Sequence, residues 1–169
     1  MRRLCVILLC GLVAVPAAMA ASRATGDGVL EVFHAYGAVT VNGQRGTAWG
    51  QIGKGQVIVT DYIAGDGQVL VSGADSTPIT ISSSVTLYSG KDLHFRVTGG
   101  KYKLTFGGFG IDFTAVGVGV AYLNGDDTVD DAGYYAVNGG KWIPVPTFFI
   151  PPQQSKQVPF GDQSAMSNP

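Results

Sequence analysis

The sequence predicts an all-β domain, and three observations support that prediction. Short runs rich in Val, Ile, Thr, Tyr and Phe recur along the chain, separated by Gly, Asn, Asp or Ser. No stretch keeps a helical period. Glycine accounts for 25 of the 169 residues, whereas charged residues make up only 14%, which suits short strands joined by tight turns. We therefore expect an antiparallel meander of about 10–12 short strands forming a β-sandwich or an open barrel, with a β-solenoid as the alternative.

The expected strands follow one another over most of the chain. They cover 29–36, 38–42, 47–52, 56–62, 68–72, 78–88, 92–98, 101–106, 109–116, 118–123, 133–137 and 141–145. Within 78–88, Ile79, Ile81, Val85 and Leu87 share one parity, and hydroxyl-bearing side chains dominate the other. This alternation predicts a half-buried strand.

The first twenty residues have the pattern of a secretory signal peptide. Arg2 and Arg3 supply the positive start, residues 4–15 form a short apolar run, and Ala18-Met19-Ala20 is a small-x-small cleavage site. We expect cleavage after Ala20 and a secreted or periplasmic mature protein. The apolar run is too short for a permanent membrane-spanning helix, so the mature chain is expected to have no transmembrane segment.

The remaining chain has the length of one domain. We expect a single β domain over 21–150 and a disordered tail rich in Pro, Gln and Ser over 151–169. Both cysteines, Cys5 and Cys10, lie in the signal peptide, so the mature chain has no disulfide. Removal of the signal changes the formal net charge from −1 to −3, and this acidic balance argues against nucleic acid as a partner.

Paired glycines predict two consecutive hairpins. A turn at Gly99-Gly100 would place Arg96 opposite Lys103, and a second turn at Gly107-Gly108 would continue the meander. Both turns give one apolar face, formed by Phe95, Val97, Tyr102, Leu104, Ile111 and Phe113. A slip of one residue in either hairpin would turn this set toward solvent.

The same hairpins suggest a basic cluster. Arg96, Lys103, His94 and Lys101 would lie near one another, with Asp112 on the next strand. Such a cluster could bind phosphates or uronates of an envelope polymer. The alternative is a solvent-exposed ladder in which Asp112 offsets the repulsion between like charges.

An acidic loop follows the glycine-rich run. Asp126, Asp127, Asp130 and Asp131 place four carboxylates within six residues, and oxygen-rich loops bind calcium. The spacing differs from that of an EF-hand, and the late bidentate glutamate is missing. A solvated turn is the alternative to a calcium site, and we expect no other cofactor.

The residues do not indicate an enzyme. There is no G-x-S-x-G motif, Glu31 is the only glutamate, and most aspartates lie in predicted turns, so a pair of glycosidase carboxylates is not indicated. Four aromatic residues, Trp49, Trp142, Tyr134 and Tyr135, could stack on sugars, although a tryptophan in a small β domain often belongs to the core.

The stretch from about Tyr36 to Pro146, above all HFRVTGGKYKLTFGGFGIDFTAVGVGVAYLNGD, resembles a loose set of exported bacterial glycine-rich all-β proteins. Those proteins carry serial Gly-x-hydrophobic segments and a late glycine-rich run. The set has no established activity, so the resemblance implies no catalytic residue.

Together these observations predict a non-enzymatic protein of the bacterial envelope that acts as a structural module or binds a protein or polymer. Its edge strands could pair with another chain or with a second copy. The alternative function is a carbohydrate- or ligand-binding β-sandwich, with a small hydrolase as a weaker one.

Overall fold

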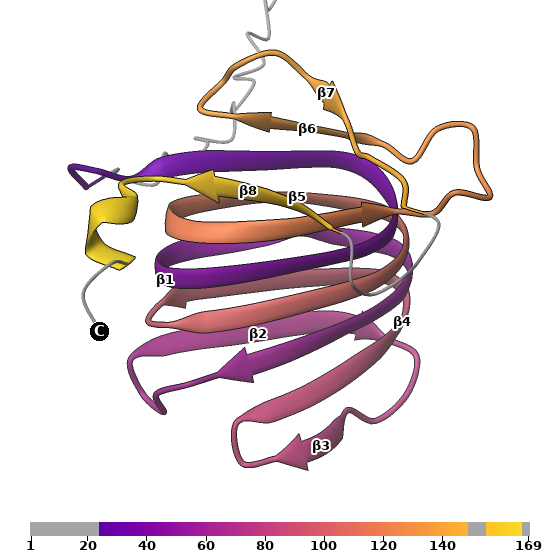
Figure 1. The fold of residues 1–169 in the computed structure, drawn as a ribbon. Helices are drawn as coiled ribbons and strands as arrows, with labels where there is room; N and C mark the ends of the chain where they lie inside the picture. The colour runs from indigo at the N-terminus through magenta and orange to yellow at the C-terminus, as the bar shows by residue number, and fades with distance from the viewer. Residues whose placement is uncertain (1–23, 149–154, 167–169) are drawn as a thin grey trace, which may run out of the picture.

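A computed structural model describes residues 24–148 and 155–166, so the expected signal peptide lies outside the described residues. The elements are β1 (Gly28–Asp61), β2 (Gly67–Ala74), β3 (Ile79–Ser82), β4 (Val85–Gly99), β5 (Tyr102–Gly125), β6 (Tyr134–Val137), β7 (Ile143–Pro144), β8 (Lys156–Phe160) and the 3-10 helix η1 (Gln163–Met166). All the named strands pair antiparallel in one unclosed sheet (Figure 1), which confirms the predicted all-β class.

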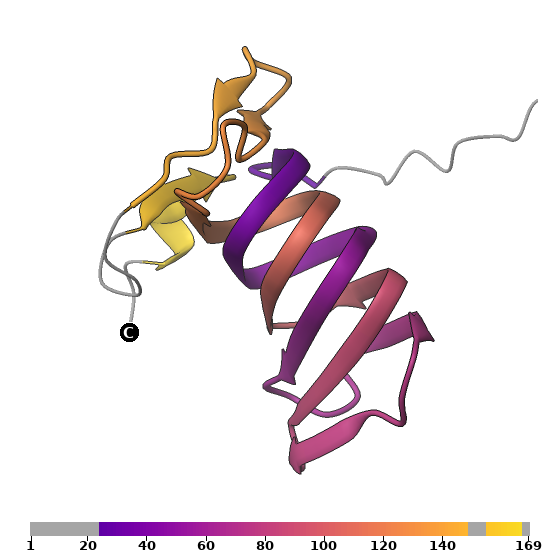
Figure 2. The same ribbon diagram turned by 90° about the vertical axis from the view of Figure 1, so that its right-hand side faces the viewer.

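The long strands β1 and β5 wind around a common axis. Val39 of β1 pairs with both Phe106 and Leu123 of β5, and Phe113 of β5 pairs with both Val32 and Gly50 of β1. Each strand therefore lies between two turns of the other. Figure 2 shows this winding as alternating indigo and orange coils.

The winding produces two layers packed face to face. In spatial order, the first layer contains 134–137, 28–33, 111–117, 46–52, 93–98 and 67–72. The second layer contains 156–160, 119–125, 37–43, 102–108, 54–61, 85–91 and 79–82. The chain alternates between layers on its outward path and again on its return, so the fold is a flattened, antiparallel, two-stranded β-helix. It combines the predicted sandwich with the coiled path of the solenoid alternative.

Glycines allow the strands to bend at the corners between layers. Gly108 pairs with Gly37 on one side and with Gly55 on the other. Its φ of 145° is one that residues with a side chain rarely adopt, and a Cβ there would overlap the carbonyl oxygen of Lys54. The backbones of neighbouring turns can therefore approach closely only where both strands lack side chains.

The core lies between the layers. Phe106 of the second layer is fully buried, and its ring centroid lies 4.8 Å from that of Phe95 and 5.3 Å from that of Phe113, both in the first layer. Leu30, Ile52 and other alternate residues of the strands fill the rest of a single buried cluster. The period-2 pattern of the sequence thus determines which side chains reach the core.

The predicted hairpins at Gly99-Gly100 and Gly107-Gly108 are wrong. β4 and β5 both pair with β1 and not with each other, and Gly99-Gly100 carries the chain from the first layer to the second. The six residues of the expected apolar face are nevertheless all buried in the core. Their inward direction depends on alternation along each strand, whichever strand is the partner.

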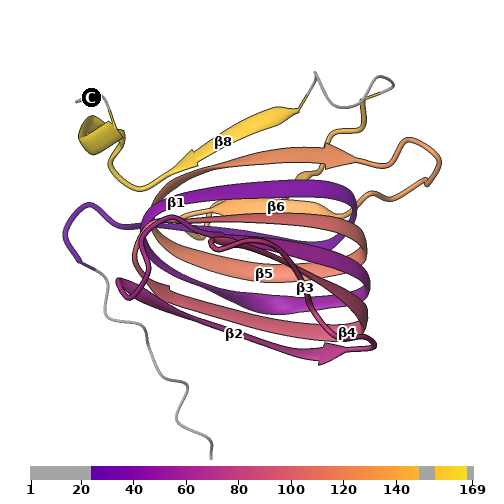
Figure 3. The ribbon, with the colours of Figure 1, turned by 90° about the horizontal axis from the view of Figure 1, so that it is seen from below.

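The expected single strand over 78–88 is also wrong. A turn separates β3 from β4, and Ile79 and Ile81 are exposed because β3 pairs only with β4 at an end of the sheet. Figure 3 views the molecule from this end. Together with Leu70 of β2, these exposed side chains form apolar surface beside the outer strands. Exposed edge strands can pair with another chain, and edge pairing with a second copy stays a prediction.

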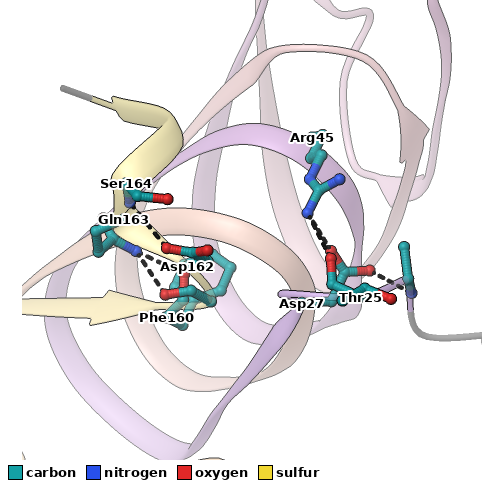
Figure 4. A network of polar contacts seen from close by, with 9 residues as sticks. Thr25, Asp27, Arg45, Phe160, Asp162, Gln163 and Ser164 are labelled. Carbon is teal, nitrogen blue, oxygen red and sulfur yellow. Dashed lines mark hydrogen bonds and ion pairs between the residues drawn. The ribbon is translucent and has the colours of Figure 1, made fainter. Parts of the chain in front are cut away.

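The predicted disordered tail is wrong for residues 156–166. β8 pairs with residues 119–123 of β5, and its Val158 and Phe160 are buried. The Gln163 amide donates a hydrogen bond to the Phe160 carbonyl at 2.9 Å, and the Ser164 N–H donates one to the Asp162 carboxylate at 2.9 Å (Figure 4). Residues 151–154 lie outside the described residues.

Replacing Tyr102 by phenylalanine is expected to stabilise the protein by about 1 kcal/mol. The Tyr102 hydroxyl is buried and finds no hydrogen-bond partner within the described structure. Burial raises the pKa of this phenol, so Tyr102 ionises more easily in the unfolded chain. Stability is therefore full below the ordinary tyrosine pKa of about 10 and falls as the pH rises above it.

Urea unfolding at pH 7 and at about pH 11 measures both effects. The Tyr102→Phe protein should lose less stability between the two pH values than the parent protein. A phenylalanine variant that is less stable at pH 7 and equally sensitive to alkali would contradict this account.

Candidate functional site

A groove crosses the outer face of the first layer. Its volume is about 460 Å³, and its aromatic lining consists of Phe33, Trp49 and Trp142. Five polar side chains also line it: Glu31, Gln51, His94, Asp112 and Thr114. We call this surface the aromatic groove. It combines flat apolar rings with hydrogen-bonding groups on a rigid sheet.

Strand register positions the central residues of the aromatic groove. Trp49 pairs with Arg96 on one side and with Thr114 on the other, and Thr114 pairs in turn with Glu31. Ala48 is fully buried, so alternation turns the Trp49 ring outward. Trp49 therefore lies in a cross-strand row of polar side chains.

A second cross-strand row lies beside the first. Gln51 pairs with His94 of β4 and with Asp112 of β5. The Asp112 carboxylate accepts a hydrogen bond of 2.7 Å from the backbone N–H of His34. This bond orients the carboxylate.

Alternation along β1 places Phe33 at one end of the groove. Val32 is buried and Phe33 pairs in register with Tyr134 of β6, so the Phe33 ring faces outward. Phe33 is exposed, and its ring centroid lies 6.2 Å from that of Trp142 in an edge-to-face arrangement. The register shift between Val32 and Ala35, with His34 at a φ of 52°, comes after Phe33 and turns Ala35 inward.

Both tryptophans of the chain are at the surface. Trp49 is 37% exposed and Trp142, just before β7, is 52% exposed. Two of the four aromatic residues that the sequence suggested for sugar stacking thus line one groove. Tyr134 is partly exposed in β6 outside the groove lining, whereas Tyr135 is buried in the core.

The predicted basic cluster does not form as one surface. His94 lines the aromatic groove and Arg96 lies beside Trp49, both in the first layer. Lys103 belongs to the second layer, where it pairs with Asn42 and Thr60. Lys101 lies at the turn between layers, with its Nζ 5.5 Å from the ring centroid of Tyr62. We expected these four residues to lie together because of the predicted hairpin at Gly99-Gly100, which the structure does not contain.

The acidic loop folds on itself. Asp126 accepts hydrogen bonds from the N–H and hydroxyl of Thr128, which lower the pKa of its carboxyl. Asp131 accepts a bond from the N–H of Gly133. Within 24–148 and 155–166, no three His, Cys, Asp or Glu side chains gather in a metal-binding group. Calcium binding by Asp126, Asp127, Asp130 and Asp131 stays a prediction.

Sequence reasoning missed the part of Phe33, Glu31 and Gln51 in the groove. Glu31 lies between the buried Leu30 and Val32, and Gln51 precedes the buried Ile52, so alternation alone could have placed both outward. Phe33 follows Val32, and the same alternation could have placed it outward as well.

No match was found among protein-family models, curated proteins or solved structures. In the part of the chain that the structure describes, no helix is long and apolar enough to cross a membrane.

Proposed function

We propose that this protein is a non-catalytic binding module of the bacterial envelope that holds a glycan chain in the aromatic groove. The observation that carries the proposal is the position of Trp49 and Trp142 on one outer surface, although the fold offers many buried sites for large side chains. A contiguous group of exposed apolar side chains rimmed by polar ones is typical of a ligand-binding groove.

The chemistry of the groove fits a sugar. The C–H face of a pyranose packs against an aromatic ring, while its hydroxyls need hydrogen-bond partners. Glu31 and Asp112 supply acceptors, Gln51 supplies both a donor and an acceptor, and all three come from strands of the sheet. A rigid sheet holds these groups in place before the ligand arrives, which lowers the entropic cost of binding.

The proposal includes no reaction. The groove residues Glu31, Asp112 and His94 serve as hydrogen-bonding groups, and export to the envelope would bring them to a surface rich in polysaccharide. The secretory signal suggested by residues 1–20 supports this location.

Replacing Trp49 or Trp142 by alanine is expected to weaken glycan binding about tenfold, because each change removes a stacking surface. A glycan array identifies the ligand, and affinity electrophoresis in gels containing that glycan measures the loss. Trp49→Phe should keep part of the affinity, since a smaller ring still offers an apolar face.

Tyr62→Ala is the matched control, because Tyr62 is an exposed aromatic residue outside the groove. It should bind as the parent protein does. Failure of the parent protein to bind any glycan, or equal losses in the Trp49, Trp142 and Tyr62 variants, would contradict the proposal.

A further inference from the structure

A second pocket lies at the corner where residues 36–38 pass from the first layer to the second. It has a volume of about 440 Å³ and lies outside the aromatic groove. Its lining includes Gly37, Gly108 and Gly125, and Gly37 pairs in register with both of the others. A Cβ at Gly37 or Gly108 would overlap neighbouring backbone, so these glycines let the turns of the winding approach closely at this corner. We call this cavity the corner pocket.

Aromatic rings form one wall of the corner pocket. Tyr36 and Phe109 pair across β1 and β5, and their rings are nearly parallel, with centroids 5.7 Å apart and an interplanar angle of 14°. Phe109 is 41% exposed. The face of an aromatic ring carries partial negative charge and attracts a cation placed over it.

Carboxylates form another wall. Asp126 and Asp127 line the pocket, and the Asp126 N–H donates a 2.9 Å hydrogen bond to the Tyr36 carbonyl, which ties the acidic loop to the aromatic wall. No lysine or arginine is found among the described residues of the lining. The pocket therefore favours positive charge.

The carboxylates make the chemistry more specific. A carboxylate accepts hydrogen bonds as well as attracting positive charge, and Asp127 is exposed. A quaternary ammonium has no N–H to donate, whereas a primary ammonium has three.

From these observations we propose that the corner pocket binds a primary ammonium group on an alkyl stem, as in a lysine side chain. The stem packs along the ring of Phe109, and the ammonium donates to the carboxylate of Asp127. This site is separate from the aromatic groove, so the proposal does not depend on glycan binding.

Titration with n-butylammonium, followed by the backbone amide signals of Gly37, Gly108 and Gly125 in NMR spectra, tests the proposal. 1-Butanol has the same alkyl stem without the charge, and we expect it to bind about tenfold more weakly. Asp127→Asn and Phe109→Leu should each weaken butylammonium binding severalfold. Asp92→Asn, which changes an exposed aspartate outside the pocket, should leave it unchanged.

The proposal would be overturned by the absence of a saturable shift with butylammonium, by equal affinity for butanol, or by equal losses in the Asp127 and Asp92 variants. Glucosamine provides a further comparison, because it carries a primary ammonium on a sugar ring. Tighter binding of glucosamine than of butylammonium would contradict the alkyl stem. Melting temperatures of all variants show whether each remains folded.

Discussion

Replacing Gly108 by alanine is expected to destabilise the protein by about 3 kcal/mol. The φ of Gly108 is 145°, and an added Cβ would lie 2.8 Å from the Cα of Gly55 as well as overlapping the Lys54 carbonyl oxygen. Both contacts are with backbone, which cannot rotate away. The change would force apart two turns of the winding that approach closely only because both residues are glycine.

Gly107→Ala is the matched control because it alters the preceding residue. A Cβ at Gly107 would meet only the flexible side chain of Gln56, at 3.7 Å. Its stability should lie within about 1 kcal/mol of the parent protein. Urea unfolding of both variants measures the difference, and similar midpoints for the two would show that the corners do not depend on glycine.

The Phe106→Ala variant is expected to lose about 3–5 kcal/mol, the range for removing a large ring from a well-packed core. Phe106 is fully buried, and its ring contacts Phe95 and Phe113 of the opposite layer. The lost ring would leave a cavity between the layers, and the strands could close that cavity only by moving the whole winding.

Phe109→Ala is the control for this change, because it removes the same ring from a partly exposed position three residues away. We expect it to cost much less than Phe106→Ala. Equilibrium unfolding monitored by circular dichroism compares them. Equal losses would mean that the contact between layers contributes little to stability.

The sequence predicted the strands better than their partners. Alternation along 92–113 placed Phe95, Leu104 and Ile111 in the core correctly, because the direction of a side chain is a local property of a strand. The partner of β4 was not predictable in this way. β1, which lies between β4 and β5, comes from a distant part of the chain, and Gly99-Gly100 permits a corner as readily as a hairpin turn.

The aromatic groove was predictable only in part. Trp49 and Trp142 stood out as aromatic residues suited to stacking, but nothing local joins a residue of β1 to a loop more than ninety residues later. The basic cluster failed for the same reason, since its grouping depended on a hairpin. The β8 strand was missed because Lys156–Phe160 is short and follows a stretch rich in proline.

The intercalation of β5 between turns of β1 has a consequence for folding during synthesis. Residues 28–61 cannot complete a sheet until residues 102–125 are available to separate their turns. A growing chain therefore lacks the partner strands it needs, and contacts between such distant segments form slowly. The protein would fold only after residues 102–125 had been synthesised, and the earlier segment would stay unpaired until then.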